Sequence, residues 1–262
     1  ISCQPCRTVC QATSQTLRGS IMNWNWQAII NYFPDLLAAS VTTIELVVLS
    51  CALGLVFGVI LGLWRLSPVL WLRAIPATYI FFFRGTPLLV QIFLIYYGLG
   101  QFTALKESFL WDPIFSQAYW CAIIAFTLNT SAYIGEIVRG AVMAVPTGEL
   151  EAADAIGMSK QQKLHRVILP RAFGIMIPAY SNEVIFMLKG SALAASITVV
   201  ELTHKARDII SITYLHLEMF FAAGVIYLVI SWVFLFIFRQ FEHRVNRHKR
   251  YIPPAVNPNP PI

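Results

Sequence analysis

The chain contains Glu151-Ala152-Ala153-Asp154-Ala155-Ile156-Gly157, followed after nine residues by Val167-Ile168-Leu169-Pro170. This polar, alanine-rich segment separates two long apolar stretches. Gly157 can adopt the left-handed conformation that ends a helix, and Ser159 with Gln162 fits the capping box that begins the next one. The pattern predicts a helical hairpin that turns sharply at the glycine, with a second arm that leads directly into an apolar span.

The first arm of this hairpin has the features of a surface that receives another protein. Thr147 is expected to cap it, and Glu149 lies in the first turn, where a negative charge is favourable. Ala152 and Ala153 keep the helix thin, so a partner can approach its backbone closely. An ordinary amphipathic connector would explain a Glu-Ala-Ala triplet alone, but the full pattern that includes Gly157 favours a docking surface.

The composition is that of an integral membrane protein. Of 262 residues, 57% are hydrophobic and only 12% are charged, against about 25% charged in a soluble domain, and the mean hydropathy is +0.65. A membrane-spanning helix needs roughly 20 apolar residues, so the length allows five or six spans and no large soluble domain. The net charge of +6 is spread over loops between spans, which argues against a nucleic-acid partner.

Five apolar spans are predicted, so the fold class is an all-α membrane protein with five transmembrane helices. They run over about 36–63, 74–99, 119–145, 168–188 and 220–238. Asp35 is expected to cap the first span. Arg84-Gly85-Thr86-Pro87 interrupts the second. Residues 191–200 are apolar but too short to cross, and predict a re-entrant or packed loop.

The chain divides into an extension over 1–33, a transmembrane domain over 34–245 and a proline-rich tail over 246–262. Met22 resembles a natural start, so residues 1–21 are interpreted as an upstream extension without the apolar core of a signal peptide. This extension holds Cys3, Cys6 and Cys10. Their spacing could suggest a metal or cluster site, but no nearby histidine or further cysteine completes four ligands, so no metal is predicted.

The distribution of Lys and Arg predicts the orientation. Cations follow the first span, flank the hairpin and follow the last span, all on one side of the membrane. They include Arg65, Arg73, Lys160, Lys163, Arg166, Arg171, Arg239 and Arg244. Because such residues accumulate in the cytoplasm, we expect the hairpin and the C-terminus to be cytoplasmic and the N-terminus to lie outside.

Several motifs of the chain resemble those of one transporter family. They are Phe83-Arg84-Gly85-Thr86-Pro87-Leu88-Leu89-Val90-Gln91, Leu128-Asn129-Thr130 and Ala179-Tyr180-Ser181-Asn182-Glu183-Val184, together with the hairpin. Over roughly 34–245 the chain resembles the polar amino-acid permeases of bacterial ABC importers, in the branch for histidine, lysine, arginine, ornithine and opines. In this resemblance the hairpin is the coupling loop that receives the ATPase. Its expected ATPase-coupling residues are Glu151, Ala152, Ala153, Gly157 and Pro170.

The resemblance also implies partners and a location. The chain would be a multi-pass subunit of the bacterial inner membrane, surrounded by membrane lipid. Two ATP-binding subunits, a second permease subunit (a paralogue or a copy) and a periplasmic amino-acid-binding protein would complete the importer. ATP and Mg would bind to the partner ATPase, so no cofactor and no catalytic residue is expected in this chain.

Four polar residues are predicted at one level near the middle of the membrane. At 1.5 Å per residue, Glu45 and Asn129 lie about 15 Å into their spans, and Asn182 and Glu183 about 18–20 Å from the opposite edge. Intramembrane ionisable residues are functional candidates, so these four are the predicted substrate contacts. Neither carboxylate has a cation at its own depth, so a cationic amino acid could supply one; backbone groups or the partner subunit are the alternative.

A second polar group is predicted near the inner edge. Glu136 can pair with Arg139 at i, i+3 or with Arg84 across helices, as a gate or a structural ion pair. One face of this helix is shared by Asn129, Tyr133, Glu136 and Gly140. In the first span, Gly54, Gly58 and Gly62 recur every four residues and predict a ridge for close helix packing.

The leading hypothesis is a permease subunit of an ATP-driven importer for basic amino acids: arginine, lysine, histidine or ornithine. Glutamine, glutamate or another polar amino acid is the alternative substrate, and a passive channel is the alternative of another class. A membrane enzyme is disfavoured because all five histidines fall outside the predicted spans. The chain also lacks a glycine-rich phosphate loop with a lysine, so it is not expected to hydrolyse ATP.

Overall fold

The computed structural model describes residues 24–109 and 111–246, and these are helical, with no strand among them. The α-helices are α2 (Trp26–Trp64), α3 (Leu70–Gly85), α4 (Leu88–Phe93), α5 (Thr103–Lys106), α6 (Ala118–Met143), α7 (Thr147–Ala155), α8 (Lys160–Lys163), α9 (Leu169–Gly190), α10 (Leu202–Thr213) and α11 (His216–Asn246). Short π- and 3₁₀-helical segments are η1 (Leu94–Gly98), η2 (Leu99–Gln101), η3 (Trp111–Phe115), η4 (Leu164–Ile168) and η5 (Ser191–Ile197).

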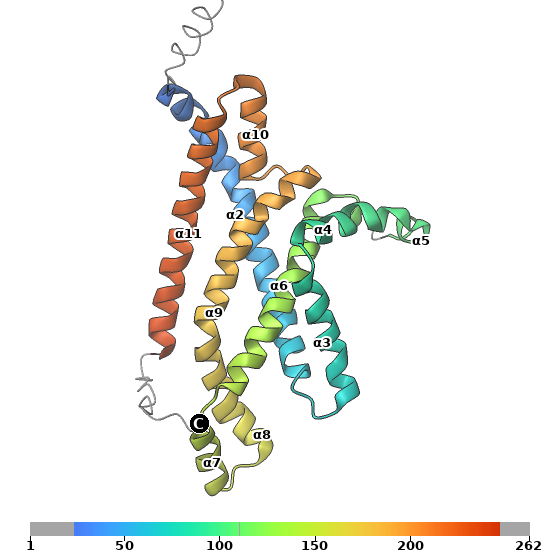
Figure 1. The fold of residues 1–262 in the computed structure, drawn as a ribbon, viewed down its shortest axis with the longest axis vertical. Helices are drawn as coiled ribbons and strands as arrows, with labels where there is room; N and C mark the ends of the chain where they lie inside the picture. Colours follow the sequence, from blue (N-terminus) through green and yellow to red (C-terminus); the bar gives the residue numbers. More distant parts are fainter. Residues whose placement is uncertain (1–23, 110, 247–262) are drawn as a thin grey trace, which may run out of the picture.

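Between three and five of these elements can cross a membrane. Helices α2, α6 and α11 are each long and apolar enough, and two bent helix pairs raise the number to five if each counts as one span. The start of α2 lies at one end of the bundle, whereas the α7–α8 hairpin and the end of α11 lie towards the other (Figure 1). The predictions for residues 1–21 and for the tail beyond Asn246 concern residues outside those that the structure describes.

The first span begins earlier than predicted. Its N-cap is Asn25, whose side chain accepts a hydrogen bond from the backbone N–H of Ala28, so the expectation that Asp35 caps the helix is wrong. Pro34 lies inside α2. The helix continues before the proline because Ala28 packs in an apolar cluster with residues of α10 and α11. Tertiary packing thus outweighs the local cost of an internal proline.

The predicted glycine ridge is confirmed as the contact between α2 and α6. A Cβ atom built on Gly54 would lie 2.8 Å from Cγ2 of Thr130, and one on Gly58 would lie 2.6 Å from Cβ of Ile134. On Gly62 it would lie 2.7 Å from the carbonyl oxygen of Gly135. Only glycine therefore allows the two backbones to approach this closely.

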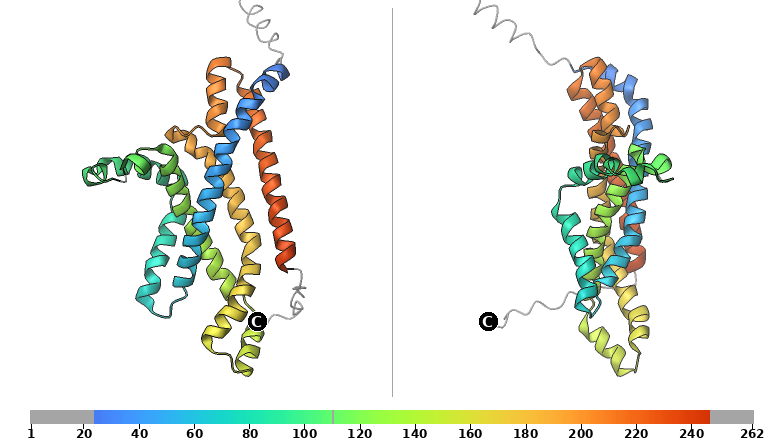
Figure 2. Two further views of the ribbon diagram at one scale, coloured as in Figure 1. Left: turned by 180° about the vertical axis from the view of Figure 1, so that it is seen from behind. Right: turned by 90° about the vertical axis from the view of Figure 1, so that its right-hand side faces the viewer.

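The second span is broken where the sequence predicts. The segments Leu70–Gly85 and Leu88–Gln101 meet at an angle of 106°, and the α4–α5 arm projects from the side of the bundle (Figures 1 and 2). Thr86 is extended, as expected for a residue before proline. The buried side chain of Gln91 donates to the carbonyl oxygen of Phe83 at 2.8 Å and to Oγ1 of Thr86 at 2.7 Å. These bonds satisfy groups that the break leaves without helical partners.

The apolar segment after α9 is packed, as predicted, but the helix that follows it was not predicted. Residues of η5 are buried, among them Ala194 and Ile197. Helix α10 then follows, and its N-cap is Glu201, whose fully buried carboxylate accepts hydrogen bonds from the backbone N–H groups of Thr203 and His204. Only one face of α10 is apolar, so its composition did not distinguish it from a loop.

The hairpin has the predicted shape with one difference at its start. Gly157 has a φ of 75°, in the left-handed region, and Ser159 with Gln162 forms the complete capping box. Thr147 does not cap α7, because it is the first helical residue, and the N-cap position belongs to Pro146. The fixed φ of proline suits the entry to a helix. Helices α7 and α8 protrude beyond the long helices (Figure 2).

Candidate functional site

A cavity of about 750 Å³ lies between the α4 region, α6, α9 and η5. Asn129 and Tyr133 of α6 line one side, and Asn182 and Glu183 of α9 line another. Pro87 and Leu88, at the break before α4, also line the cavity. Three of the four predicted substrate contacts are therefore brought together.

Glu183 is the most unusual group in this cavity. Its side chain is buried, with 8% of the residue exposed, and it makes no hydrogen bond or ion pair with any part of the chain that the structure describes. A carboxylate in such an environment needs a cation or a proton to offset the loss of hydration.

The expectation that Glu183 has no cation at its depth needs a correction. Arg84, at the end of α3, is close enough to act on Glu183 electrostatically, and Lys189 lines the same cavity. Sequence counting missed Arg84 because the second span breaks immediately after it, at the end of α3, so counting residues from one edge did not give its depth. Lys189 follows Asn182 by seven residues and so shares its helix face. The cavity thus holds charges of both signs.

Asn129 has a structural task as well as a place in the cavity. Its Nδ2 atom donates to Oε1 of Gln91 at 3.0 Å and to the carbonyl oxygen of Phe83 at 3.2 Å. It therefore fixes the break between α3 and α4. Asn182, in contrast, is exposed at the surface of α9.

Glu45 is not brought to this cavity. It lies on an exposed part of α2, beside the hydroxyl group of Tyr119. Depth along a helix axis predicted its level, but it does not report the direction in which a side chain points. The structure therefore separates Glu45 from Asn129, Asn182 and Glu183.

The ion pairs near the other end of α6 involve a residue that the sequence did not single out. Glu136 pairs with Arg139, as predicted, and also with Arg65 at the end of α2. Arg84, the predicted cross-helix partner, instead lies over the ring of Tyr133, 5.1 Å from its centroid. Arg65 is the first cation after the first span, and that position was the available signal.

Tyr133 connects the two polar groups. A second cavity of about 360 Å³ is lined by Arg65, Arg84, Tyr133 and Glu136, and Tyr133 also lines the larger cavity. The predicted shared face of Asn129, Tyr133 and Glu136 thus borders consecutive cavities. Polar side chains follow one another from the Glu183 cavity towards the hairpin end of the bundle.

The hairpin is tied to α9 by charged contacts. Oε1 of Glu149 in α7 lies 2.9 Å from a guanidinium nitrogen of Arg171 near the start of α9. Oδ1 of Asp154 lies 2.6 Å from Nζ of Lys163 in α8. Each bond joins the first arm to the second arm or its continuation, so the hairpin can transmit a displacement to α9.

The predicted coupling residues lie on α7, at the turn that follows it and at the start of α9, and they differ in exposure. Glu151 and Ala152 are exposed, whereas Ala153 is buried with 3% exposure. Gly157 is exposed at the turn, and Pro170 lies in the first turn of α9. The side chain of Ile156, which is 72% exposed, presents an apolar surface at the tip that the sequence interpretation did not single out.

Comparisons with known proteins agree on one family. A family model described as "Binding-protein-dependent transport system inner membrane component" matches residues 54–247. The octopine transport system permease protein OccM of Rhizobium meliloti is 47% identical over 210 residues, covering 80% of this chain and 85% of that protein. The histidine/lysine/arginine/ornithine transport system permease protein HisM of Salmonella typhimurium is 42% identical over 206 residues, covering 79% and 88%.

A solved structure shows the same arrangement of helices. It is described as the crystal structure of an amino acid ABC transporter with histidines, and it superimposes with a TM-score of 0.76 at 33% sequence identity. The match covers 85% of this chain and 100% of that one.

Proposed function

The chain belongs to the family of binding-protein-dependent transport system inner membrane components, and from this premise we propose that it conducts basic amino acids past Glu183. It is an inner-membrane permease subunit of an amino-acid ABC transporter. It is a transport component, and the ATPase is a separate subunit. Because transport in this family is coupled to a separate ATPase, the passive-channel alternative has no support.

The observation that carries the proposal is the buried Glu183 carboxylate in a cavity of about 750 Å³. A cationic side chain of a substrate would offset the cost of burying this carboxylate. Lys189 and Arg84 would suit the α-carboxylate of the same substrate, and Asn182 can bond to either end. An amino acid with a cationic side chain carries charges that match these groups.

The substrates named for two relatives are consistent with this choice. The relative from Salmonella typhimurium is named as a permease for histidine, lysine, arginine and ornithine. The relative from Rhizobium meliloti is named as a permease for octopine. We infer a basic amino acid as the substrate class because Glu183 provides a matching charge. Glutamine or glutamate is the competing substrate class.

Substitution of Glu183 by glutamine in the complete transporter, reconstituted in vesicles, tests the proposal. Uptake of arginine and lysine is expected to fall at least about 30-fold, because removing one partner of a buried charge pair costs about 2–5 kcal/mol. Glu242→Gln in α11, away from the cavity, is the matched control. Unchanged arginine and lysine uptake by Glu183→Gln would remove this residue from the substrate path. Glutamine uptake that exceeds arginine uptake in the unmodified protein would favour the competing class.

The coupling role of the hairpin is part of the same proposal. We infer that two ATP-binding subunits, which hold ATP and Mg, contact α7 and the turn at Gly157, and that this end is cytoplasmic. A second permease subunit, a paralogue or a copy, would complete the pore, and a periplasmic binding protein would deliver the substrate. The connection of α8 through η4 to α9 supports a transfer of motion from the hairpin to the cavity, because α9 carries both Arg171 and Glu183.

A cysteine pair tests this contact. Ala152→Cys should form a cross-link with a cysteine on the ATPase surface, and the yield should change when ATP is added. A cysteine in place of Ser211, exposed on α10 at the other end of the bundle, is the control and should not cross-link. Equal yields at both positions would refute the assignment.

A further inference from the structure

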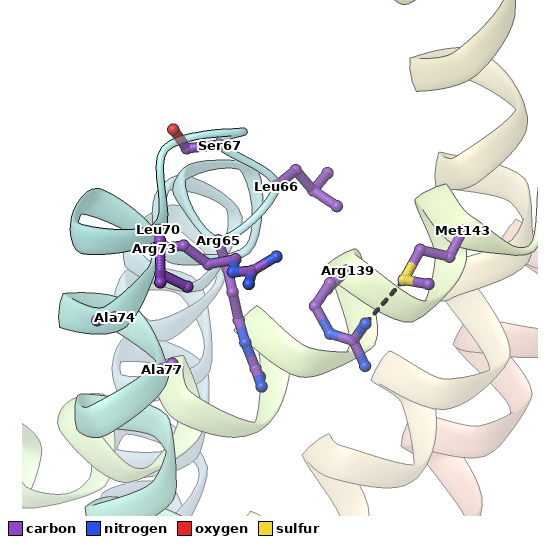
Figure 3. A pocket seen from close by; sticks show the side chains of 9 residues that line it. All are labelled: Arg65, Leu66, Ser67, Leu70, Arg73, Ala74, Ala77, Arg139 and Met143. Carbon is purple, nitrogen blue, oxygen red and sulfur yellow. Dashed lines mark hydrogen bonds between the residues drawn. The ribbon is translucent and has the colours of Figure 1, made fainter.

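A third cavity, of about 520 Å³, lies where the end of α2 and the start of α3 face the end of α6. Its walls carry three guanidinium groups, from Arg65, Arg73 and Arg139. Figure 3 shows these side chains extending into the space between the α2–α3 turn and α6. The substrate cavity around Glu183 shares none of the residues that line this one.

The cavity carries excess positive charge. No acidic side chain is among the described residues that line it. The neighbouring Glu136 pairs with Arg65 and Arg139, but it supplies one negative charge against three positive ones. Two positive charges therefore remain uncompensated, and a cationic amino acid would be repelled here.

Two of the three arginines have hydrogen-bond donors to spare. The guanidinium group of Arg73 makes no hydrogen bond or ion pair with residues 24–109 or 111–246. Arg139 directs Nη1 at Sδ of Met143, 2.7 Å away (Figure 3), although a thioether is only a weak acceptor. A guanidinium group binds phosphate through two parallel N–H···O bonds, so both residues suit a phosphate oxygen better than their present surroundings.

The surface around the cavity is apolar and aromatic. Trp71 is 83% exposed and Leu70 is 62% exposed at the start of α3, and Trp64 is exposed at the end of α2. Tryptophan favours the membrane–water interface. Farther along α3, Ile75 and Phe81 are also exposed, so an apolar surface runs from the arginines towards the centre of the bundle. A lipid with a charged headgroup and long acyl chains matches a basic cavity that adjoins an apolar helix surface.

We propose that this cavity binds the phosphodiester headgroup of an anionic glycerophospholipid. Arg73 and Arg139 hold the phosphate oxygens, Arg65 adds positive charge, and the acyl chains lie along the exposed face of α3. Basic pockets between helices at the membrane interface are suited to such headgroups. The site is independent of the substrate assignment, because it involves neither Glu183 nor its cavity.

Lipid counting by native mass spectrometry tests the proposal on the complete transporter, without amino acid or ATP. Detergent-purified protein is mixed with equal amounts of phosphatidylglycerol and phosphatidylcholine. The unmodified protein should retain phosphatidylglycerol preferentially, and Arg73→Gln should lower that retention about fivefold, the effect of one arginine near a lipid surface. Arg207→Gln, an exposed arginine of α10, is the matched control and should retain it fully.

Further measurements distinguish lipid binding from the binding of other ligands and from an effect of misfolding. Arg73→Lys keeps the charge and should retain more phosphatidylglycerol than Arg73→Gln. Equal melting temperatures for the variants would show that folding is intact. Equal phosphatidylglycerol retention by Arg73→Gln and the unmodified protein would overturn the proposal. Full displacement of the lipid by millimolar inorganic phosphate would also overturn it, because the site would then bind free phosphate.

Discussion

Substitution of Gly58 by alanine measures how closely α2 and α6 must approach. The new Cβ would lie 2.6 Å from Cβ and 2.7 Å from Cγ2 of Ile134, and 3.0 Å from the carbonyl oxygen of Ser131. The Cβ of Ile134 is bonded to the backbone, so no side-chain rotation relieves the clash and the helices must separate. Overpacking of this kind costs about 1–3 kcal/mol, and the higher helix propensity of alanine offsets up to about 1 kcal/mol of it.

Gly140→Ala is the matched control, because Gly140 is also a helical glycine and, apart from its own helix backbone, no described atom lies within 4 Å of a Cβ built there. Thermal unfolding of the detergent-purified transporter should show a lower melting temperature for Gly58→Ala and an equal or higher one for Gly140→Ala. Equal shifts for the two variants would refute the reasoning, since they would show that the α2–α6 contact tolerates an added methyl group. A loss confined to Gly58→Ala would confirm the packing role.

Three further substitutions have expected outcomes. Gln91→Leu should destabilise the transporter by about 2 kcal/mol or more in thermal unfolding, because buried carbonyl groups lose their donor. In a double-mutant cycle with Asn129→Leu, the losses of unfolding free energy should not add. Glu201→Ala should cost about 2 kcal/mol in the same assay through loss of the α10 cap, and an unchanged melting temperature would contradict this. Gly157→Ala should strain the turn at φ 75° and reduce ATP-driven uptake more than binding-protein affinity, whereas Gly148→Ala, with open space around it, should not.

The positions of the spans could be predicted because apolar length and helix-breaking residues are properties of the sequence itself. The break at Pro87, the turn at Gly157 and the glycine ridge follow from local steric rules, and the structure contains all three. The start of α2 could not be predicted, because it depends on contacts of Ala28 with α10 and α11. Helix α10 was missed because its stability comes from the Glu201 cap and from packing of one apolar face.

The candidate site was predicted in part, for a similar reason. Counting residues gives the depth of Asn129, Asn182 and Glu183 along their helices, and these residues do line one cavity. Rotation about the helix axis decides whether a side chain at that depth faces the cavity, and Glu45 faces elsewhere. The approach of Arg84 to Glu183 depends on how the end of α3 packs beside α9, and the sequence does not specify that packing.

Helix α9 connects the proposed substrate cavity with the proposed ATPase contact, and an ion pair links the start of this helix to the hairpin. Arg171, bound to Glu149, ties the first turn of α9 to the hairpin, so a displacement of α7 reaches α9 through an ion pair as well as through the covalent chain. About 18 Å farther along the same helix, Glu183 faces a cavity whose opposite walls belong to α6 and the α4 region. Those walls are held together by the Asn129–Gln91 hydrogen bond. A shift of α9 against them would therefore change the surroundings of Glu183 while the opposite wall stays intact, which is what a binding site that must release its substrate requires.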